Sequence, residues 1–173
     1  MPYLADRLED PELSVQISAV TAIQKISMIN PRLFLVTIPK LFQMMSTKSN
    51  WLLIRLVKLL CEMSKVEKRL MPKLTAKFKE MLQNPLAKSV EYEIIRQTFA
   101  TELNEDAELF ELARQTLLQQ FLIVPDPNLT FLGLEALVAL MEQRKLRKQA
   151  VEIYSSERQA VVNLFNSNDQ CIQ

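Results

Sequence analysis

The stretch of sequence that decides the fold is Asp126-Pro127-Asn128-Leu129-Thr130-Phe131-Leu132-Gly133-Leu134-Glu135-Ala136-Leu137. Asp126 suits the position just before a helix, where a side-chain carboxylate accepts hydrogen bonds from free backbone N–H groups. Pro127 suits the first helical position, because an N–H at that position would have no partner inside the helix. Together the two residues predict that a helix begins here.

This helix carries two apolar faces, one made by Leu129, Leu132, Ala136 and Leu140 and the other by Phe131, Leu134, Val138 and Met141. A surface helix needs one apolar stripe, so we expect a helix with two stripes to lie between neighbours. Gly133, the only glycine in the chain, falls in its middle. Because glycine destabilises a helix by about 1 kcal/mol relative to alanine, we expect that it lets a neighbouring backbone come close.

Helix-start signals recur at Asp10-Pro11, Ser49-Asn50, Asn84-Pro85 and Asn168-Asp169, at intervals of about 40 residues, with two helical stretches between successive signals. The apolar spacing predicts helices over residues 11–29, 31–45, 51–63, 67–82, 86–103, 110–124 and 149–165, besides the one that begins at Pro127. Pro39 is expected to kink the second of these helices or to mark its true start.

This period predicts an all-α, HEAT/armadillo-like α-solenoid of stacked antiparallel helix pairs. We expect residues 1–173 to form a single solenoid segment with incomplete repeats at both ends.

The composition excludes several functional classes. The chain is 49% apolar and carries 21 basic and 20 acidic residues, which predicts a folded core and gives no bulk electrostatic reason to bind nucleic acid. It has no histidine, so Ser-His-Asp and Cys-His catalytic arrangements are impossible within it. Its two cysteines predict neither a disulfide framework nor a zinc site, and Cys61 is expected in the core. We therefore expect no enzymatic activity, no cofactor and no metal.

Two further features have a functional and a structural interpretation. The acidic pairs Glu91/Glu93 and Glu102/Glu105 could act in acid–base chemistry, but solvated helix faces are the preferred interpretation. Trp51, directly after a helix-start signal, is either a binding anchor or, as we favour, a side chain that fills the joint between two repeats.

One basic cluster is a candidate contact site, and we call it the basic link: Arg144, Lys145, Arg147 and Lys148. Four cations on a connection between helices could contact anionic lipid headgroups or an acidic partner surface. Glu142, Glu152 and Glu157 lie nearby in sequence, and a plain solvated connection is the favoured interpretation.

Several motifs resemble the trunk of the adaptins, the large chains of clathrin-type adaptor complexes. They are Asp126 to Leu129, Leu132 to Leu134, Pro39 to Phe42 and Asn50 to Leu60, and the last two are most similar to the delta branch of the family, found in adaptor complex three. The similarity extends over most of the chain. One departure concerns the subtype: the family usually has a basic residue and a tyrosine where Thr130 and Phe131 stand.

The resemblance implies a scaffold segment in vesicle transport between Golgi, endosomes and lysosome or vacuole. It implies other adaptor-complex subunits as partners and a cytoplasmic location, peripheral on Golgi and endosomal membranes through the complex. It transfers no cargo, lipid or GTPase contact to a residue of this chain. The alternatives are another cytosolic HEAT scaffold, such as a transport receptor or phosphatase scaffold, and a small helical enzyme or lipid-binding bundle.

Overall fold

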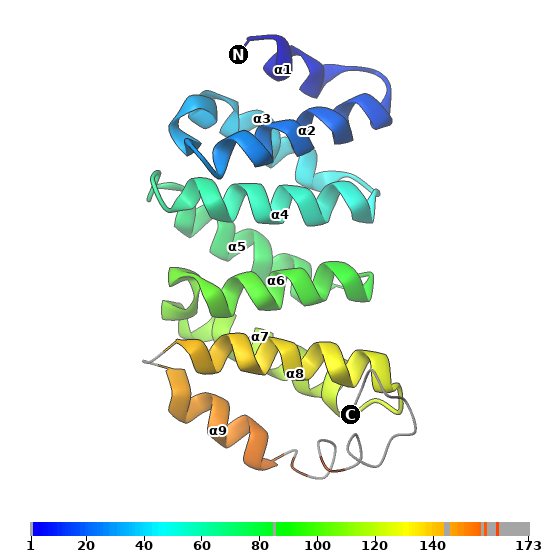
Figure 1. Ribbon diagram of the computed structural model, residues 1–173, viewed down its shortest axis with the longest axis vertical. Helices are drawn as coiled ribbons and strands as arrows, with labels where there is room; N and C mark the ends of the chain where they lie inside the picture. The colour runs from blue at the N-terminus through cyan, green and yellow to red at the C-terminus, as the bar shows by residue number, and fades with distance from the viewer. Residues whose placement is uncertain (1, 85, 144–145, 157, 159–161, 163–173) are drawn as a thin grey trace. The chain divides into compact units, whose positions relative to one another are not determined.

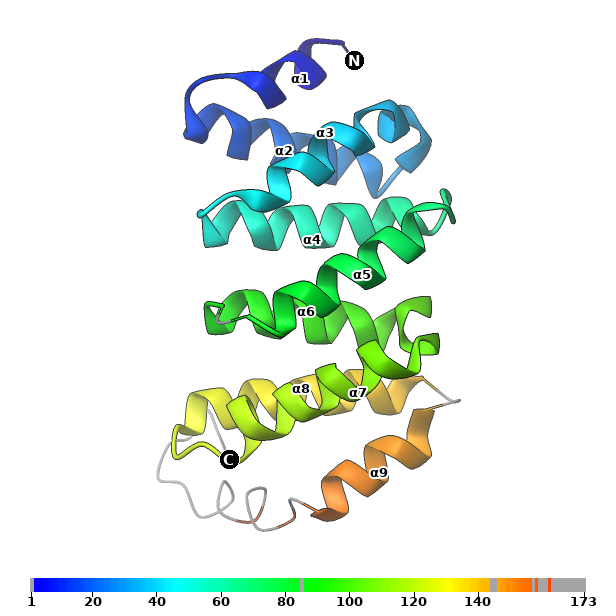
Figure 2. The same ribbon diagram turned by 180° about the vertical axis from the view of Figure 1, so that it is seen from behind.

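The computed structural model describes residues 2–84, 86–143, 146–156, 158 and 162, and this part of the chain contains helices and no strand. The all-α, HEAT-like class is therefore confirmed, and within each of two compact units long helices lie side by side with further elements packed against them (Figures 1 and 2). The chain divides into two compact units, residues 1–78 and 79–173, and the boundary falls inside one helix, α5.

The first unit consists of two long helices and a second layer of shorter elements. Its elements are α1 (Pro2–Asp6), the 3₁₀ helix η1 (Arg7–Glu9), α2 (Leu13–Ser27), the 3₁₀ helix η2 (Pro31–Thr37), α3 (Ile38–Gln43), the 3₁₀ helix η3 (Met44–Ser46), α4 (Asn50–Ser64) and the first part of α5 (Leu70–Leu82). Helices α2 and α4 lie side by side, and η2 and α3 pack behind them (Figures 1 and 2).

Prolines and short polar side chains set the element boundaries in this unit. Pro39 falls in the first turn of α3, so it marks the true start of that helix, and the residues before it form the 3₁₀ helix η2. Ser49 caps α4 as expected, because its Oγ accepts a hydrogen bond from the Leu52 N–H at 3.4 Å. Helix α2 was expected to begin at Pro11 but begins two residues later, at Leu13. Asp10 accepts a 3.1 Å hydrogen bond from the N–H of Glu12, which is the residue just before the helix.

The second unit begins with the end of α5. It continues with α6 (Lys88–Ala100), the 3₁₀ helix η4 (Glu102–Glu105), α7 (Ala107–Leu117), the π-helical turn η5 (Leu118–Leu122), α8 (Pro127–Glu142) and α9 (Arg147–Ser156). Helices α6 and α8 lie side by side, and α7 with η5 packs against both.

The core of the second unit is a continuous apolar cluster. It contains Ile95, Phe99, Ala113, Leu117, Phe121, Leu122, Ala136, Leu137, Leu140, Ala150 and Ile153, all almost completely buried. Aromatic rings connect its elements, since Phe99 of α6 lies 5.5 Å from Phe110 of α7 and Tyr92 of α6 lies 6.1 Å from Phe121 of η5, between ring centroids.

The decisive stretch forms α8, and Asp126 caps it by accepting hydrogen bonds from the N–H groups of Asn128 at 2.9 Å and Leu129 at 3.4 Å. The expected close packing at Gly133 is confirmed, but the close neighbours are the Phe121 and Leu122 side chains rather than a backbone. No described residue has a positive φ. Gly133 is therefore needed for the space left by its missing side chain and not for an unusual backbone conformation.

The expectation that both apolar faces of α8 are covered is wrong. Ala136, Leu137 and Leu140 are buried, whereas Phe131, Val138 and Met141 are between 43% and 56% exposed. The physical reason is that the charged side chains of Glu135 and Glu142 share the second face, so it is not an uninterrupted apolar stripe.

The signal at Asn84-Pro85 is also misread in part. Asn84 belongs to the end of the preceding helix, because its side-chain amide donates a 2.6 Å hydrogen bond to the Glu80 carbonyl. Helix α6 begins at Lys88, without a side-chain cap from Ala87. The signal at Asn168-Asp169 and the end of the last expected helix lie outside the described residues. Within the described part of the chain, no helix has both the length and the apolar character needed to cross a bilayer.

Candidate functional site

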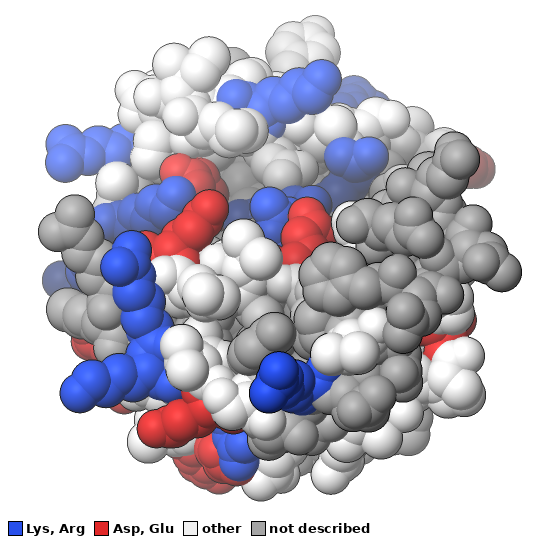
Figure 3. All heavy atoms as spheres, turned by 60° about the horizontal axis from the view of Figure 1, so that its bottom comes forward, with Lys and Arg blue, Asp and Glu red and all other residues white. Residues whose placement is uncertain are grey.

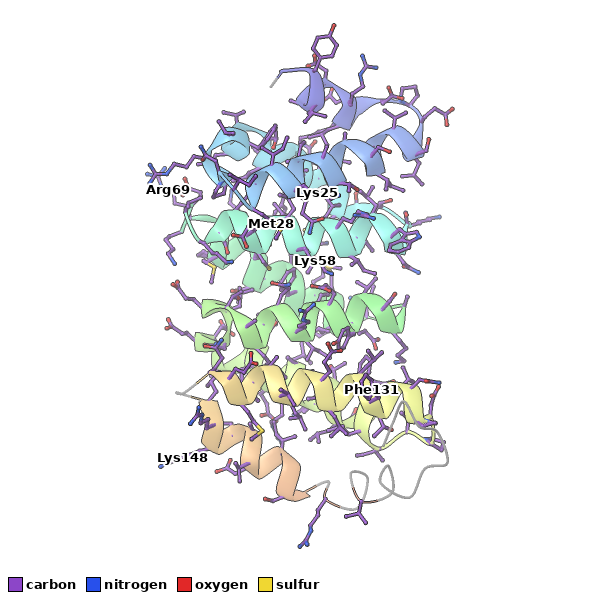
Figure 4. All side chains as sticks on the ribbon, viewed as in Figure 1. Lys25, Met28, Lys58, Arg69, Phe131 and Lys148 are labelled. Atoms are coloured by element: carbon purple, nitrogen blue, oxygen red, sulfur yellow. The ribbon has the colours of Figure 1, made fainter. Side chains whose placement is uncertain are left out.

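The basic link lies between α8 and α9, and the structure describes half of it. Arg144 and Lys145 are outside the described residues. Arg147 and Lys148 form the first turn of α9 and are exposed, with Lys148 pointing away from the helices (Figure 4). The Arg147 Nε donates a 3.1 Å hydrogen bond to the Met141 carbonyl. Because this carbonyl lies in the last turn of α8, Arg147 has a helix-capping role of its own.

The charges on this side of the molecule are mixed. Figure 3 shows lysine and arginine side chains interspersed with aspartate and glutamate among the described residues of that face. A mixed field of this kind weakens long-range attraction to an anionic surface. The described residues in that view therefore do not form a uniformly positive surface.

The expectation of solvated faces holds for one of the two acidic pairs. Glu102 and Glu105 are exposed on η4. Glu91 and Glu93 are 7% and 3% exposed, which corrects the expectation for them. Their carboxylates are hydrogen-bonded: Glu91 accepts from the Lys88 ammonium at 2.9 Å and Glu93 accepts from the Gln97 amide at 2.8 Å. These partners explain how the two carboxylates tolerate burial.

A network of three charged groups connects the second unit's part of α5 to the start of α7. The Lys79 ammonium lies 2.6 Å from the Glu108 carboxylate and 2.9 Å from the Asp106 carboxylate. Asp106 also caps α7, because it accepts a 2.8 Å hydrogen bond from the Leu109 N–H. Hydrogen bonds from Lys79 and Leu109 lower the pKa of Asp106, so this carboxylate stays ionised. These interactions indicate a structural network.

A hollow of about 330 Å³ lies between α7 and α9, lined by Phe110, Glu111, Arg114, Gln149, Glu152 and Ile153. Arg114 donates two hydrogen bonds to Glu111, at 2.8 and 2.6 Å, and this pairing lowers the pKa of Glu111. The pair offsets the charges of Glu111 and Arg114, and Glu152 is the remaining acidic side chain among the residues that line the hollow. The described residues contain no group of three or more acidic or cysteine side chains that could hold a metal ion.

Trp51 contradicts the expectation that it fills a joint between repeats. Its side chain is 67% exposed on α4, and the Arg55 guanidinium carbon lies over its ring, 5.5 Å from the centroid. The reason lies in the spacing: Trp51, Arg55, Lys58 and Glu62 fall on one side of the helix. The polar character of this stripe was the signal in the sequence that Trp51 faces solvent. Cys61 is 1% exposed, so the expectation of a core position is confirmed.

These side chains belong to a surface that the sequence interpretation missed, which we call the α2–α4 face. Its residues are Ser14, Ser18, Thr21, Lys25 and Met28 along and just after α2 and Trp51, Arg55, Lys58, Glu62 and Lys65 along and just after α4. Both sets have the spacing of one helix side. Thr21, Arg55, Lys58 and Glu62 are half-buried, and the other residues of the face are exposed. Lys25, Met28 and Lys58 lie on neighbouring parts of the two helices (Figure 4).

Comparisons with known proteins agree on one family. The model of the adaptin N terminal region matches residues 1–169. The AP-3 complex subunit delta of Saccharomyces cerevisiae is 31% identical over 170 residues, and that of Eremothecium gossypii is 36% identical over 130 residues. The AP-3 complex subunit delta-1 of Bos taurus is 28% identical over 178 residues.

These matches cover 96%, 74% and 99% of the chain but 18%, 14% and 14% of the relatives, so the chain spans less than a fifth of their length. A solved structure of an engineered protein has a similar fold, with a TM-score of 0.60 and 14% identity over 98% of this chain and 75% of that one.

Proposed function

The chain belongs to the adaptin family, and on that premise we propose that it is a non-enzymatic scaffold segment of a delta-type large chain in an adaptor complex for vesicle-mediated protein transport. The observation that carries this proposal is the family match over residues 1–169, together with relatives that are named as AP-3 complex subunit delta. The whole complex, its cargo and its route are parts of the proposal, because the relatives are much longer than this chain.

Stacked helix pairs suit the proposed role for a physical reason. Each pair buries its apolar faces against its neighbours, so such a segment is stiff over short distances and can hold binding sites at fixed separations. In the second unit, the fully buried cluster from Ile95 to Ile153 supplies this rigidity. The absence of histidine from the sequence removes the commonest general base and metal ligand, which supports a non-enzymatic role.

The test is to tag the parent chain in its own cells, isolate it under mild conditions and identify the stable co-purifying proteins. We expect the other subunits of one adaptor complex in near-equal amounts, with peripheral association to Golgi or endosomal membranes. A tagged, unrelated HEAT-repeat protein is the control for generic binding. Stable recovery of nuclear-transport or phosphatase components instead would replace this proposal with one of the other HEAT-scaffold functions.

We further propose that the basic link contributes to recruitment, through contact with an acidic partner surface or anionic lipid. The discriminating variant reverses three charges, at Arg144, Lys145 and Lys148, and leaves Arg147 intact because its guanidinium caps α8. Salt-dependent loss of membrane recruitment or of one subunit is the expected result, since exposed charges are screened by salt. Unchanged recruitment and assembly would mean that the link is a solvated connection.

A further inference from the structure

We propose that the α7–α9 hollow, the space of about 330 Å³ between those two helices, binds a lysine side chain of a partner protein. The proposal concerns the second unit alone and does not depend on the adaptor function. It rests on three features of the residues that line the hollow: an excess of one carboxylate, a buried amide oxygen without a hydrogen bond, and an apolar wall.

The hollow contains one carboxylate more than it contains cations. Its charged lining residues are Glu111, Arg114 and Glu152. Arg114 donates two hydrogen bonds to Glu111, so this pair offsets its own charges. The pKa of Arg114 is raised first by Glu111 and also by the charge of Glu152, which therefore lies near the guanidinium. The two carboxylates and one guanidinium leave a net negative charge, which favours a ligand with one positive charge.

The cations that precede Glu152 on α9 lie outside the hollow. The Arg147 guanidinium bonds to the Met141 carbonyl at the end of α8. Lys148 lies one helical turn before Glu152, and its side chain points away from the helices (Figure 4). Neither residue lines the hollow, so neither takes the place that we assign to the ligand.

Gln149 offers the ligand a hydrogen-bond acceptor. Its Oε1 is buried and accepts no hydrogen bond. A buried acceptor without a donor costs free energy, and a ligand in the hollow that Gln149 lines can supply the missing N–H. Gln149 and Glu152 are three positions apart on α9, so both side chains lie on one side of the helix. An ammonium has three N–H donors, enough to bond to the amide and the carboxylate together.

Phe110 of α7 and Ile153 of α9 give the hollow an apolar wall. Ile153 is almost completely buried, and the half-buried Phe110 ring is held by the Phe99 ring, 5.5 Å away between centroids. A lysine side chain packs its methylene stem along apolar surface and keeps its charged end near polar groups. Because the hollow is open to solvent, the stem can enter while the backbone that carries it stays outside.

A single lysine fits the hollow better than other charged ligands do. A lipid phosphate or a carboxylate would meet a net negative charge and a guanidinium that is already bonded to Glu111. A polyamine carries two or more positive charges, whereas the hollow has an excess of one carboxylate. The lysine ammonium is a compact charge on a flexible apolar stem, which matches one carboxylate beside an apolar wall.

The first experiment titrates the 173-residue protein, ¹³C-labelled at its isoleucine methyl groups, with the blocked peptide Gly-Ala-Lys-Ala-Gly. We expect a saturable shift of the Ile153 methyl signal in NMR spectra, weaker at higher salt. The same peptide with norleucine in place of lysine retains the apolar stem without the charge and should give no saturable shift. Glu152→Gln should weaken binding about threefold, and Glu152→Lys about tenfold, because an attraction is lost and then reversed.

A matched control is Glu105→Gln, which removes an exposed carboxylate of η4, outside the hollow. It should bind the peptide like the unmodified protein. Gln149→Met replaces the amide by an apolar group of similar length. This variant should bind the peptide more weakly and unfold at a higher urea concentration, since the buried unsatisfied oxygen is gone. Circular dichroism establishes that each variant is folded.

Three results would overturn the proposal. Equal weakening by Glu105→Gln and Glu152→Gln would show that binding follows net charge and not the hollow. If putrescine shifts the Ile153 signal at lower concentration than the peptide does, with the same dependence on Glu152, the hollow is a site for free diamines. If neither probe gives a saturable shift, the hollow binds no alkylammonium group. The adaptor proposal would survive each result, because it is tested by the co-purifying subunits.

Discussion

Gly133 in α8 lies directly against the side chain of Leu122 in η5: a Cβ atom at position 133 would stand 2.7 Å from Leu122 Cδ2 and 3.1 Å from Phe121 Cβ. Real Cβ atoms almost never approach other atoms as closely as the first of these distances. The two elements therefore pack at a separation that only glycine allows without movement, and this contact accounts for the single glycine of the chain.

The first prediction concerns this contact. Gly133→Leu should lower the free energy of unfolding by about 1–3 kcal/mol, because the added atoms overpack the joint. Gly133→Ala adds one carbon and removes a helix penalty of about 1 kcal/mol, so the clash and the helix gain should nearly cancel. In a Leu122→Ala background the same alanine should stabilise, since the nearest atom is gone. Urea denaturation of the four proteins measures this coupling, and equal effects of Gly133→Ala in both backgrounds would contradict the contact.

The second prediction concerns Asp106 and pH. Its pKa is lowered in the folded protein by Lys79 and the Leu109 N–H, so the unfolded chain binds more protons in the acid range. The resulting stability is present above the carboxyl's ordinary pKa of about 3.9 and is lost as the pH falls through the lower folded value. Asp106→Asn retains a cap oxygen but does not titrate, so it should flatten the acid limb of stability against pH. A variant with the unchanged acid slope would show that the Asp106 interactions contribute little.

The third prediction concerns the cap of α8. Asp126→Ala removes the acceptor of two backbone N–H groups and should cost about 1 kcal/mol in the free energy of unfolding. Asp126→Ser should recover most of that loss, because serine is also a good cap. Thermal or urea denaturation provides the measurement. If alanine and serine behave alike, the start of α8 is held by packing rather than by its cap.

The fourth prediction concerns Trp51. Because its side chain is 67% exposed, unfolding should change the wavelength of its emission very little, while circular dichroism reports the full loss of helix. Acrylamide should quench the folded protein almost as efficiently as the unfolded one. A large red shift on unfolding would instead indicate a buried ring, as expected for a side chain that fills a joint.

The sequence was sufficient for the parts of the fold that depend on local chemistry. Asp126 and Ser49 cap the helices that they were expected to cap, and Pro39 begins α3. The sequence was insufficient where a side chain can form either of two local hydrogen bonds. Asn84 can cap the following helix or bond to the turn before it, and its bond to the Glu80 carbonyl shows that the second solution is used.

The candidate site was harder to predict because exposure depends on packing between helices. Trp51 is a large apolar residue of a kind expected in a core. Only the spacing that it shares with Arg55 and Lys58 places it on the solvent-exposed side of α4. Lys25 is isolated in sequence from the other cations and joins them only because α2 lies beside α4. The basic link was visible in sequence because its four cations are almost consecutive, which says nothing about what they contact.

The π-helical turn at Leu118–Leu122 has a consequence for how this chain can vary in length. Its Ile123 N–H bonds to the Leu118 carbonyl five residues earlier, at 3.0 Å, so this turn holds one residue more than an α-turn would. Loss of the exposed Gln119 could be absorbed by a return to α-helical bonding, which keeps Phe121 and Leu122 directed at α8. Loss of a residue inside α7, such as Glu111, would rotate every later side chain of the helix by about 100° and turn its apolar stripe away from the core. We therefore expect this turn to be the point at which α7 tolerates a one-residue deletion.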